Sequence, residues 1–262
     1  MPQPDPGFSD ETPPHAHLVQ LYDTDDRALI ENVGRYVCES LQRGGGAIII
    51  ATPEHRTAFA REVAQLDAAA NEAVAAGRFV LLDAEETLAR FMVDGQPDWE
   101  RFASTIEPAL ADLRERSGAA RLRAYGEMVG VLWQAGHYAA AIRLEEFWNR
   151  LLSGGGFELF CAYPIDVFGD EFRDAEIDAV LRTHTHLVPA DDGQLQRAVH
   201  RAMDEVLGQH AEGVRRLVDT NDRPAWAAIP NAEAVILWLR NNLPAYADEI
   251  LTRARRHYVA AA

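Results

Sequence analysis

The chain has 262 residues, which is enough for one large domain or for one domain with an appendage. Its 41 acidic and 25 basic residues give a formal net charge of -16. This charge argues against nucleic acid or an anionic membrane surface as a direct partner, because both require clustered cations. All of the basic residues are arginine, so the chain cannot supply the lysine of a Walker A phosphate loop or of a Schiff-base enzyme.

The first residues of the chain do not resemble a targeting segment. Residues 1–14 are rich in proline and acidic side chains, which predicts a disordered leader without the basic and apolar regions of a signal peptide. No apolar run approaches the ~20 residues of a membrane span. The two cysteines, Cys38 and Cys161, lie far apart within apolar runs and indicate no disulfide framework. We therefore expect a cytoplasmic protein that does not contact a membrane.

Short apolar runs then alternate with longer segments of helical periodicity. A first helix should follow the turn at residues 23–26 and end at the glycines 44–46. The expected strands are 17–22, 47–52, 78–83, 120–129 (running into a loop) and 157–164, and the further expected helices are 53–77, 84–95, 98–118, 139–155 and 170–184. This alternation predicts βαβ units, and therefore an α/β fold with a mostly parallel sheet flanked by helices.

The pattern changes after residues 186–193. One helical face is predicted to carry the apolar residues Leu195, Val199, Met203, Val206, Val214 and Leu217. Two more helical segments are bracketed by Pro230 and Pro244. The chain is therefore expected to consist of a leader (1–14), an α/β domain (15–190) and a helical C-terminal segment (191–262).

Several segments of the α/β part resemble a known family. They are HLVQLYDTDD, IIIATPEHR, GRFVLLDAEETLARFMVDGQPD, RAYGEMVGVLWQAG, AAIRLEEFWNRL, FELFCAYP and THTHLVP. Over residues 15–190 they are similar, in the same order, to the MEDS domain, the sensory domain of methanogen and methylotroph proteins and of the dichloromethane-responsive repressor. That family is thought to be a degenerate relative of RecA/KaiC-type ATPases. The resemblance implies a RecA/KaiC-like sheet with a degenerate phosphate loop and a role in signal transduction, and it does not define a ligand.

The turn at residues 23–26 stands where a nucleotide-binding α/β protein carries its phosphate loop. It contains Asp23, Asp25 and Asp26 and no glycine, so three carboxylates would repel a triphosphate. One interpretation is that Asp25 or Asp26 caps the following helix. The other is a site adapted to a neutral or cationic ligand, or to Mg²⁺.

Two further groups are expected beyond the carboxyl ends of strands, where open α/β sheets bind ligands. Thr52, Glu54 and His55 follow the second strand, and the alternative for them is an ordinary helix start. Glu127 follows the fourth strand, where burial would raise the pKa of its carboxyl group. Its structural alternative is an internal ion pair with Arg123 or Arg143.

A third candidate group lies on the helix predicted at 139–155. Helical spacing places Glu145, Trp148 and Asn149 on one face, which could line a pocket or could simply contain a core tryptophan. Trp133 and Tyr163 could add aromatic walls. Two His-x-His pairs, at residues 15–17 and 184–186, could chelate a metal, although hydrogen-bonded structural histidines are the favoured interpretation.

These observations favour a non-catalytic sensory protein that binds an unidentified small organic ligand and signals through a regulatory protein partner; a homodimer is left open. No catalytic residue, metal ion or cofactor is assigned. The alternatives are an interaction module without a ligand, with its pocket filled by tryptophans, and an enzyme or residual nucleotide binder that uses Glu127 and Asp25 with a metal. The ligand-binding residues are expected to be Tyr22, Thr52, His55, Glu127, Trp133, Glu145, Trp148, Asn149 and Tyr163.

Overall fold

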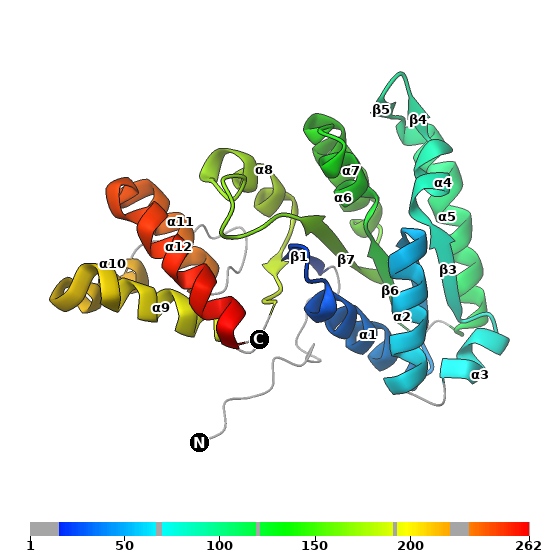
Figure 1. The fold of residues 1–262 in the computed structure, drawn as a ribbon. Helices are drawn as coiled ribbons and strands as arrows, with labels where there is room; N and C mark the ends of the chain where they lie inside the picture. The colour runs from blue at the N-terminus through cyan, green and yellow to red at the C-terminus, as the bar shows by residue number, and fades with distance from the viewer. Residues whose placement is uncertain (1–15, 67–69, 119–120, 191–192, 221–230, 262) are drawn as a thin grey trace. The chain divides into compact units, whose positions relative to one another are not determined.

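The structure is a computed structural model, and it describes residues 16–66, 70–118, 121–190, 193–220 and 231–261 (Figure 1). The predicted leader and His15 lie outside the described residues. The chain consists of two compact units, which we describe separately. The first contains residues up to 18 and residues 26–163, and the second contains residues 19–25 and 164–262.

The predicted α/β architecture is confirmed. The strands are β1 (His17–Tyr22), β2 (Gly46–Ala51), β3 (Phe79–Asp83), β6 (Leu122–Gly126), β7 (Phe157–Pro164) and β8 (His186–Leu187). They form one sheet in the order β3-β2-β6-β7-β1-β8, and β2 pairs in parallel with both β3 and β6, as does β6 with β7. Because every residue of β2 and β6 is buried, these strands lack polar alternation, as expected for strands covered on both faces.

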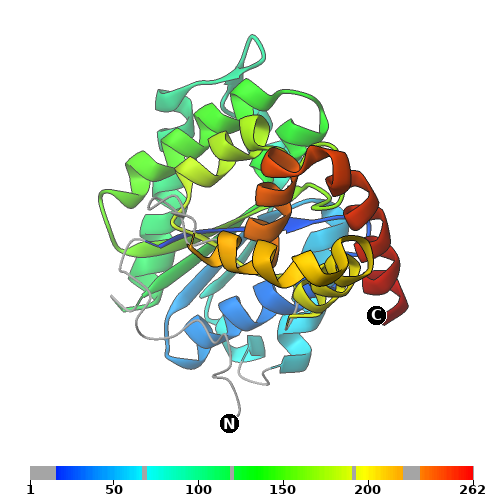
Figure 2. The same ribbon diagram turned by 90° about the vertical axis from the view of Figure 1, so that its left-hand side faces the viewer.

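Helices cover both faces of the sheet in the first unit. They are α1 (Arg27–Gln42), α2 (Pro53–Leu66), α3 (Ala70–Ala75), α4 (Ala84–Ala89), α5 (Trp99–Arg116), α6 (Met128–Gln134) and α7 (Tyr138–Leu152). Figure 2 shows the sheet between α1 and α2 on one side and α6 and α7 on the other. The start of α2 at Pro53 agrees with the prediction, since proline is well suited to the first turn of a helix.

Strand alternation directs successive side chains to opposite faces of this sheet. Tyr125 of β6 points to the α1/α2 face, where its ring lies 4.9 Å from that of Phe59 on α2. Cys161 of β7 points to the opposite face, where its Sγ lies 3.6 Å from a carboxylate oxygen of Glu145 on α7. The two faces therefore hold different sets of polar side chains.

Several predicted elements in the first unit have different limits. The helix expected over 84–95 ends at Ala89, because Asp94 and Gly95 adopt positive φ and form the turn between the short strands β4 (Met92–Val93) and β5 (Gln96–Pro97). The strand expected over 120–129 ends at Gly126, and helix α6 follows where a loop was predicted. Over 53–77 the described residues form α2 and α3, and residues 67–69 between them lie outside the described part of the chain.

The second unit contains α8 (Asp174–Thr183), α9 (Gln194–Leu207), a 3₁₀ turn (Gly208–His210), α10 (Ala211–Thr220), α11 (Asn231–Asn242) and α12 (Pro244–Ala261). Helices α9 and α12 pack against each other. Gly208, at φ 55°, interrupts the single amphipathic pattern read from the sequence. Leu195, Val199 and Met203 are buried as predicted, whereas Leu217 is 57% exposed, so the predicted apolar face does not extend through α10. Among the described helices, none has the length and apolar character of a membrane span.

Candidate functional site

Two neighbouring strands end together at the carboxyl edge of the sheet. Ile50 of β2 pairs with Gly126 of β6, and the Glu127 N–H donates to the Ile50 carbonyl at 3.1 Å. The residues that follow these strands are thereby brought side by side. We name the group formed by Asp26, Thr52, His55, Tyr125 and Glu127 the carboxyl-edge cluster.

Glu127 is the centre of this cluster and is only 2% exposed. One carboxylate oxygen accepts from the Thr52 backbone N–H. The other lies 2.6 Å from His55 Nδ1 and accepts from the Tyr125 hydroxyl at 3.1 Å. The structural alternative for Glu127 was an internal ion pair with Arg123 or Arg143. That prediction was wrong about the partner, because Glu127 contacts His55 instead.

Arg123 forms its ion pairs elsewhere. It is buried on the α1/α2 face, where its Nε lies 3.1 Å from Glu158 and its Nη1 2.9 Å from Glu39. Glu158 is the residue opposite Arg123 in the register of β6 and β7. Sequence reasoning missed this pair, although two opposite charges at matching positions of adjacent buried strands were a usable signal.

His55 joins Glu127 to a second carboxylate. Its Nε2 lies 3.1 Å from Asp26 Oδ2. Asp26 occupies the N-cap position of α1 as predicted, but its side chain makes no capping hydrogen bond and contacts His55 instead. The preceding turn is stabilised locally, since the Asp25 N–H donates to the Asp23 carboxylate at 2.8 Å.

The charge state of His55 reflects these contacts. Burial by itself lowers the pKa of His55, but the hydrogen bond and charge of Glu127, together with those of Asp26, outweigh it and raise the pKa above its ordinary value. The imidazole is 13% exposed and Asp26 is 41% exposed, so solvent reaches both side chains, whereas Tyr125 and Glu127 are buried. The arrangement can hold a proton between two carboxylates at the surface of the sheet edge.

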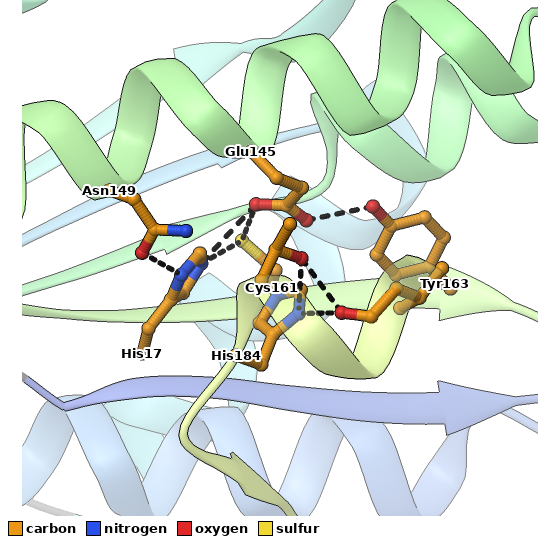
Figure 3. A network of polar contacts seen from close by, with 8 residues as sticks. His17, Glu145, Asn149, Cys161, Tyr163 and His184 are labelled. Atoms are coloured by element: carbon orange, nitrogen blue, oxygen red, sulfur yellow. Dashed lines mark hydrogen bonds and ion pairs between the residues drawn. The ribbon is translucent and has the colours of Figure 1, made fainter. Parts of the chain in front are cut away.

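A second polar group lies on the opposite face of the sheet (Figure 3). We name His17, Glu145, Asn149, Cys161 and Tyr163 the α7-face cluster. His17 Nε2 lies 3.3 Å from Glu145 Oε2 and 3.4 Å from Cys161 Sγ. His17 Nδ1 lies 2.9 Å from Asn149 Oδ1, and the Tyr163 hydroxyl donates to Glu145 Oε1 at 2.8 Å.

This cluster is buried more deeply than the first. His17, Glu145, Cys161 and Tyr163 are each at most 1% exposed. Burial, reinforced by the Glu145 charge, raises the pKa of the Cys161 thiol and of the Tyr163 phenol well above their usual values. Sequence reasoning identified Glu145, Asn149 and Tyr163 but did not group Cys161 with them. Strand periodicity could have indicated this grouping, because Cys161 lies two residues before Tyr163 and therefore on the same face of β7.

The two tryptophans among the predicted site residues are core residues. Trp148 is 1% exposed and meets the Phe102 ring edge-on at 5.1 Å. Trp133 is 5% exposed and packs against Tyr138 and Tyr163, with ring centroids 4.6 and 5.3 Å apart. The simpler interpretation of Trp148, as a core residue, agrees with this packing.

The nine predicted ligand residues therefore fall into separate groups. Thr52, His55 and Glu127 meet in the carboxyl-edge cluster, and Glu145, Asn149 and Tyr163 meet in the α7-face cluster. Tyr22 ends β1 in the second unit. In that unit the His184 Nδ1 lies 2.7 Å from the Val180 carbonyl, which agrees with a hydrogen-bonded histidine.

The α/β domain thus has one polar cluster at the carboxyl edge of its sheet and one on the α7 face, and without lysine the chain has no phosphate loop of the Walker type. Comparison with family models identifies it further: residues 16–185 match the model described as MEDS, the methanogen/methylotroph, DcmR sensory domain. The match covers well over half of the chain, so the protein belongs to this family of sensory domains. No curated protein and no solved structure gave a significant match.

Proposed function

We propose that the chain is a non-catalytic sensory protein whose carboxyl-edge cluster binds a small organic molecule. The observation that supports this most directly is the Glu127–His55–Asp26 chain of contacts at the carboxyl ends of β2 and β6. Ligands of open α/β sheets bind at this edge. Family membership supports the sensory role.

The cluster favours a particular ligand chemistry. With His55 protonated, two carboxylates and one imidazolium give a net charge of about -1, which favours a neutral or cationic molecule. Both Glu127 oxygens already accept hydrogen bonds inside the protein, whereas Asp26 is 41% exposed and His55 is partly exposed beside it. We therefore propose that the ligand donates a hydrogen bond to Asp26, as an alcohol or an amine would, and that Glu127 orients His55 from behind.

The same contact offers a way to pass on the signal. Asp26 stands at the N-cap of α1, and it is the first residue of the first unit after the chain leaves residues 19–25 of the second. A ligand that replaces His55 as the partner of Asp26 would change the start of α1 at this junction. We propose that the helices of the second unit carry the response to a protein partner; Leu217, Tyr246 and Val259 are large apolar side chains exposed on them.

The test is a thermal-shift screen of the purified full-length protein against small alcohols and amines. One-carbon compounds such as methanol and methylamine come first, because the family description names methanogens and methylotrophs. A molecule that raises the melting temperature of the wild type should have little effect on Asp26→Asn and His55→Gln. Glu54→Gln serves as the control, because Glu54 lies in the same turn but is exposed. Equal stabilisation of all four proteins would contradict the proposed site.

A second candidate function, an interaction module without a ligand, is favoured by the packing of Trp133 and Trp148. Both indoles fill space that the sequence had suggested for a pocket. This alternative predicts that no small molecule shifts the melting temperature and that a partner protein does.

A further inference from the structure

The buried α7-face cluster brings three different metal-ligating atoms to one point. They are His17 Nε2, Glu145 Oε2 and Cys161 Sγ, and they lie within 4.8 Å of one another. We propose that these three residues bind a zinc-type divalent metal ion, a role independent of the function proposed for the carboxyl-edge cluster.

The distances agree with those of a tetrahedral centre. Zinc lies about 2.3 Å from thiolate sulfur, about 2.05 Å from imidazole nitrogen and about 2.0 Å from carboxylate oxygen. At tetrahedral angles these bond lengths place N and O about 3.3 Å apart, N and S about 3.55 Å apart, and O and S about 3.5 Å apart. The corresponding distances in the protein are 3.3, 3.4 and 3.6 Å. An ion therefore fits between the three atoms with little rearrangement.

The surrounding hydrogen bonds orient the ligands as in established metal sites. His17 Nδ1 lies 2.9 Å from Asn149 Oδ1, so the ring proton assigned to Nδ1 leaves the Nε2 lone pair for a metal. The Tyr163 hydroxyl donates to Glu145 Oε1, which leaves Oε2 facing His17 and Cys161. Figure 3 shows both partners on the outer side of the three ligands. Metal-bound histidines and carboxylates are usually held by such outer partners.

Charge balance supports the same conclusion. A buried carboxylate such as Glu145 requires compensation, and a divalent cation with one carboxylate and one thiolate has a net charge of about zero. The donor set of imidazole, thiolate and carboxylate suits zinc better than magnesium or calcium, which prefer oxygen ligands.

The test uses the full-length protein with elemental analysis and cobalt substitution. Wild type and Cys38→Ser should each contain about one zinc ion per chain, and Cys161→Ser should contain almost none. Cys38 is the matched control, because it is the other cysteine of the chain and is also buried, on α1. After chelation and addition of Co²⁺, the near-ultraviolet thiolate-to-cobalt absorption should appear in wild type and Cys38→Ser but not in Cys161→Ser.

A milder variant addresses the case in which Cys161→Ser does not fold. Asn149→Ala keeps all three ligands and should weaken cobalt affinity about 10- to 100-fold, because His17 loses its orienting partner. Wild-type protein without stoichiometric metal and without the thiolate band after cobalt addition would overturn the proposal. The same band at equal intensity in Cys161→Ser would overturn it as well.

Discussion

The substitution Glu127→Ala tests the carboxyl-edge cluster through stability. It removes the acceptor of three hydrogen bonds, from the Thr52 N–H, His55 and the Tyr125 hydroxyl. A buried donor left without a partner costs about 1–3 kcal/mol. Tyr125 is fully buried, so water cannot replace the acceptor that its hydroxyl loses, whereas water can reach His55, which is 13% exposed. Breaking a buried pair costs about 3–5 kcal/mol, and we expect Glu127→Ala to lower the free energy of unfolding by about that amount.

The assay is urea-induced unfolding followed by tryptophan fluorescence at neutral pH. Tyr125→Phe removes one of the three hydrogen bonds and should cost about 1 kcal/mol. Glu54→Ala, an exposed substitution in the first turn of α2, should change stability by less than about 1 kcal/mol. If Glu127→Ala is no more destabilising than Glu54→Ala, then Glu127 is not the centre of the cluster and the reasoning fails.

Two further predictions concern charge. The raised pKa of His55 means that the protonated form is favoured in the folded state, so its stabilisation is complete below the unfolded pKa of about 6.5 and is lost as pH rises through the raised folded pKa. NMR titration should show a lower His55 pKa in Glu127→Gln than in the wild type. An unchanged pKa would show that Glu127 does not stabilise the protonated form of His55. Arg123→Met removes the more deeply buried of the two arginines that pair with Glu158, Arg123 and Arg121, and should cost about 3–5 kcal/mol, part of which Arg123→Met/Glu158→Met should restore in urea unfolding. A double variant less stable than the single one would contradict the pairing.

The sequence predicted the sheet well because its signals are local. The runs 17–22 and 157–164 coincide with β1 and β7, and the Pro53 signal marks the start of α2. The resemblance to the family was also readable and is confirmed by the family match, whereas the relationship to RecA/KaiC-type ATPases, the domain boundaries and the cytoplasmic location stay predictions. The break at residues 95–97 was also expected, whereas the earlier end of α4 at Ala89 and the interruption at Gly208 were missed.

Side-chain partners were harder to predict than strands, because they depend on strand order. Glu127 lies beside Thr52 and His55 only because β2 and β6 are neighbouring strands. In the sequence, Thr52 and Glu127 are 75 residues apart. His17 meets Cys161 only because β1 lies next to β7 in the sheet. These two strands are far apart in the sequence. Neither neighbour relationship follows from periodicity, so the site residues were identified individually and their grouping was not.

The measurement that tests the central claim most directly is native mass spectrometry of the full-length protein after incubation with the low-molecular-mass fraction of an extract of its native cells. Wild type should bind an organic molecule that His55→Gln and Asp26→Asn do not bind. Any metal-sized mass should be retained in both variants, because the α7-face ligands are unchanged in them. An organic mass bound equally by all three proteins, or none bound by the wild type, would contradict ligand sensing at the carboxyl-edge cluster.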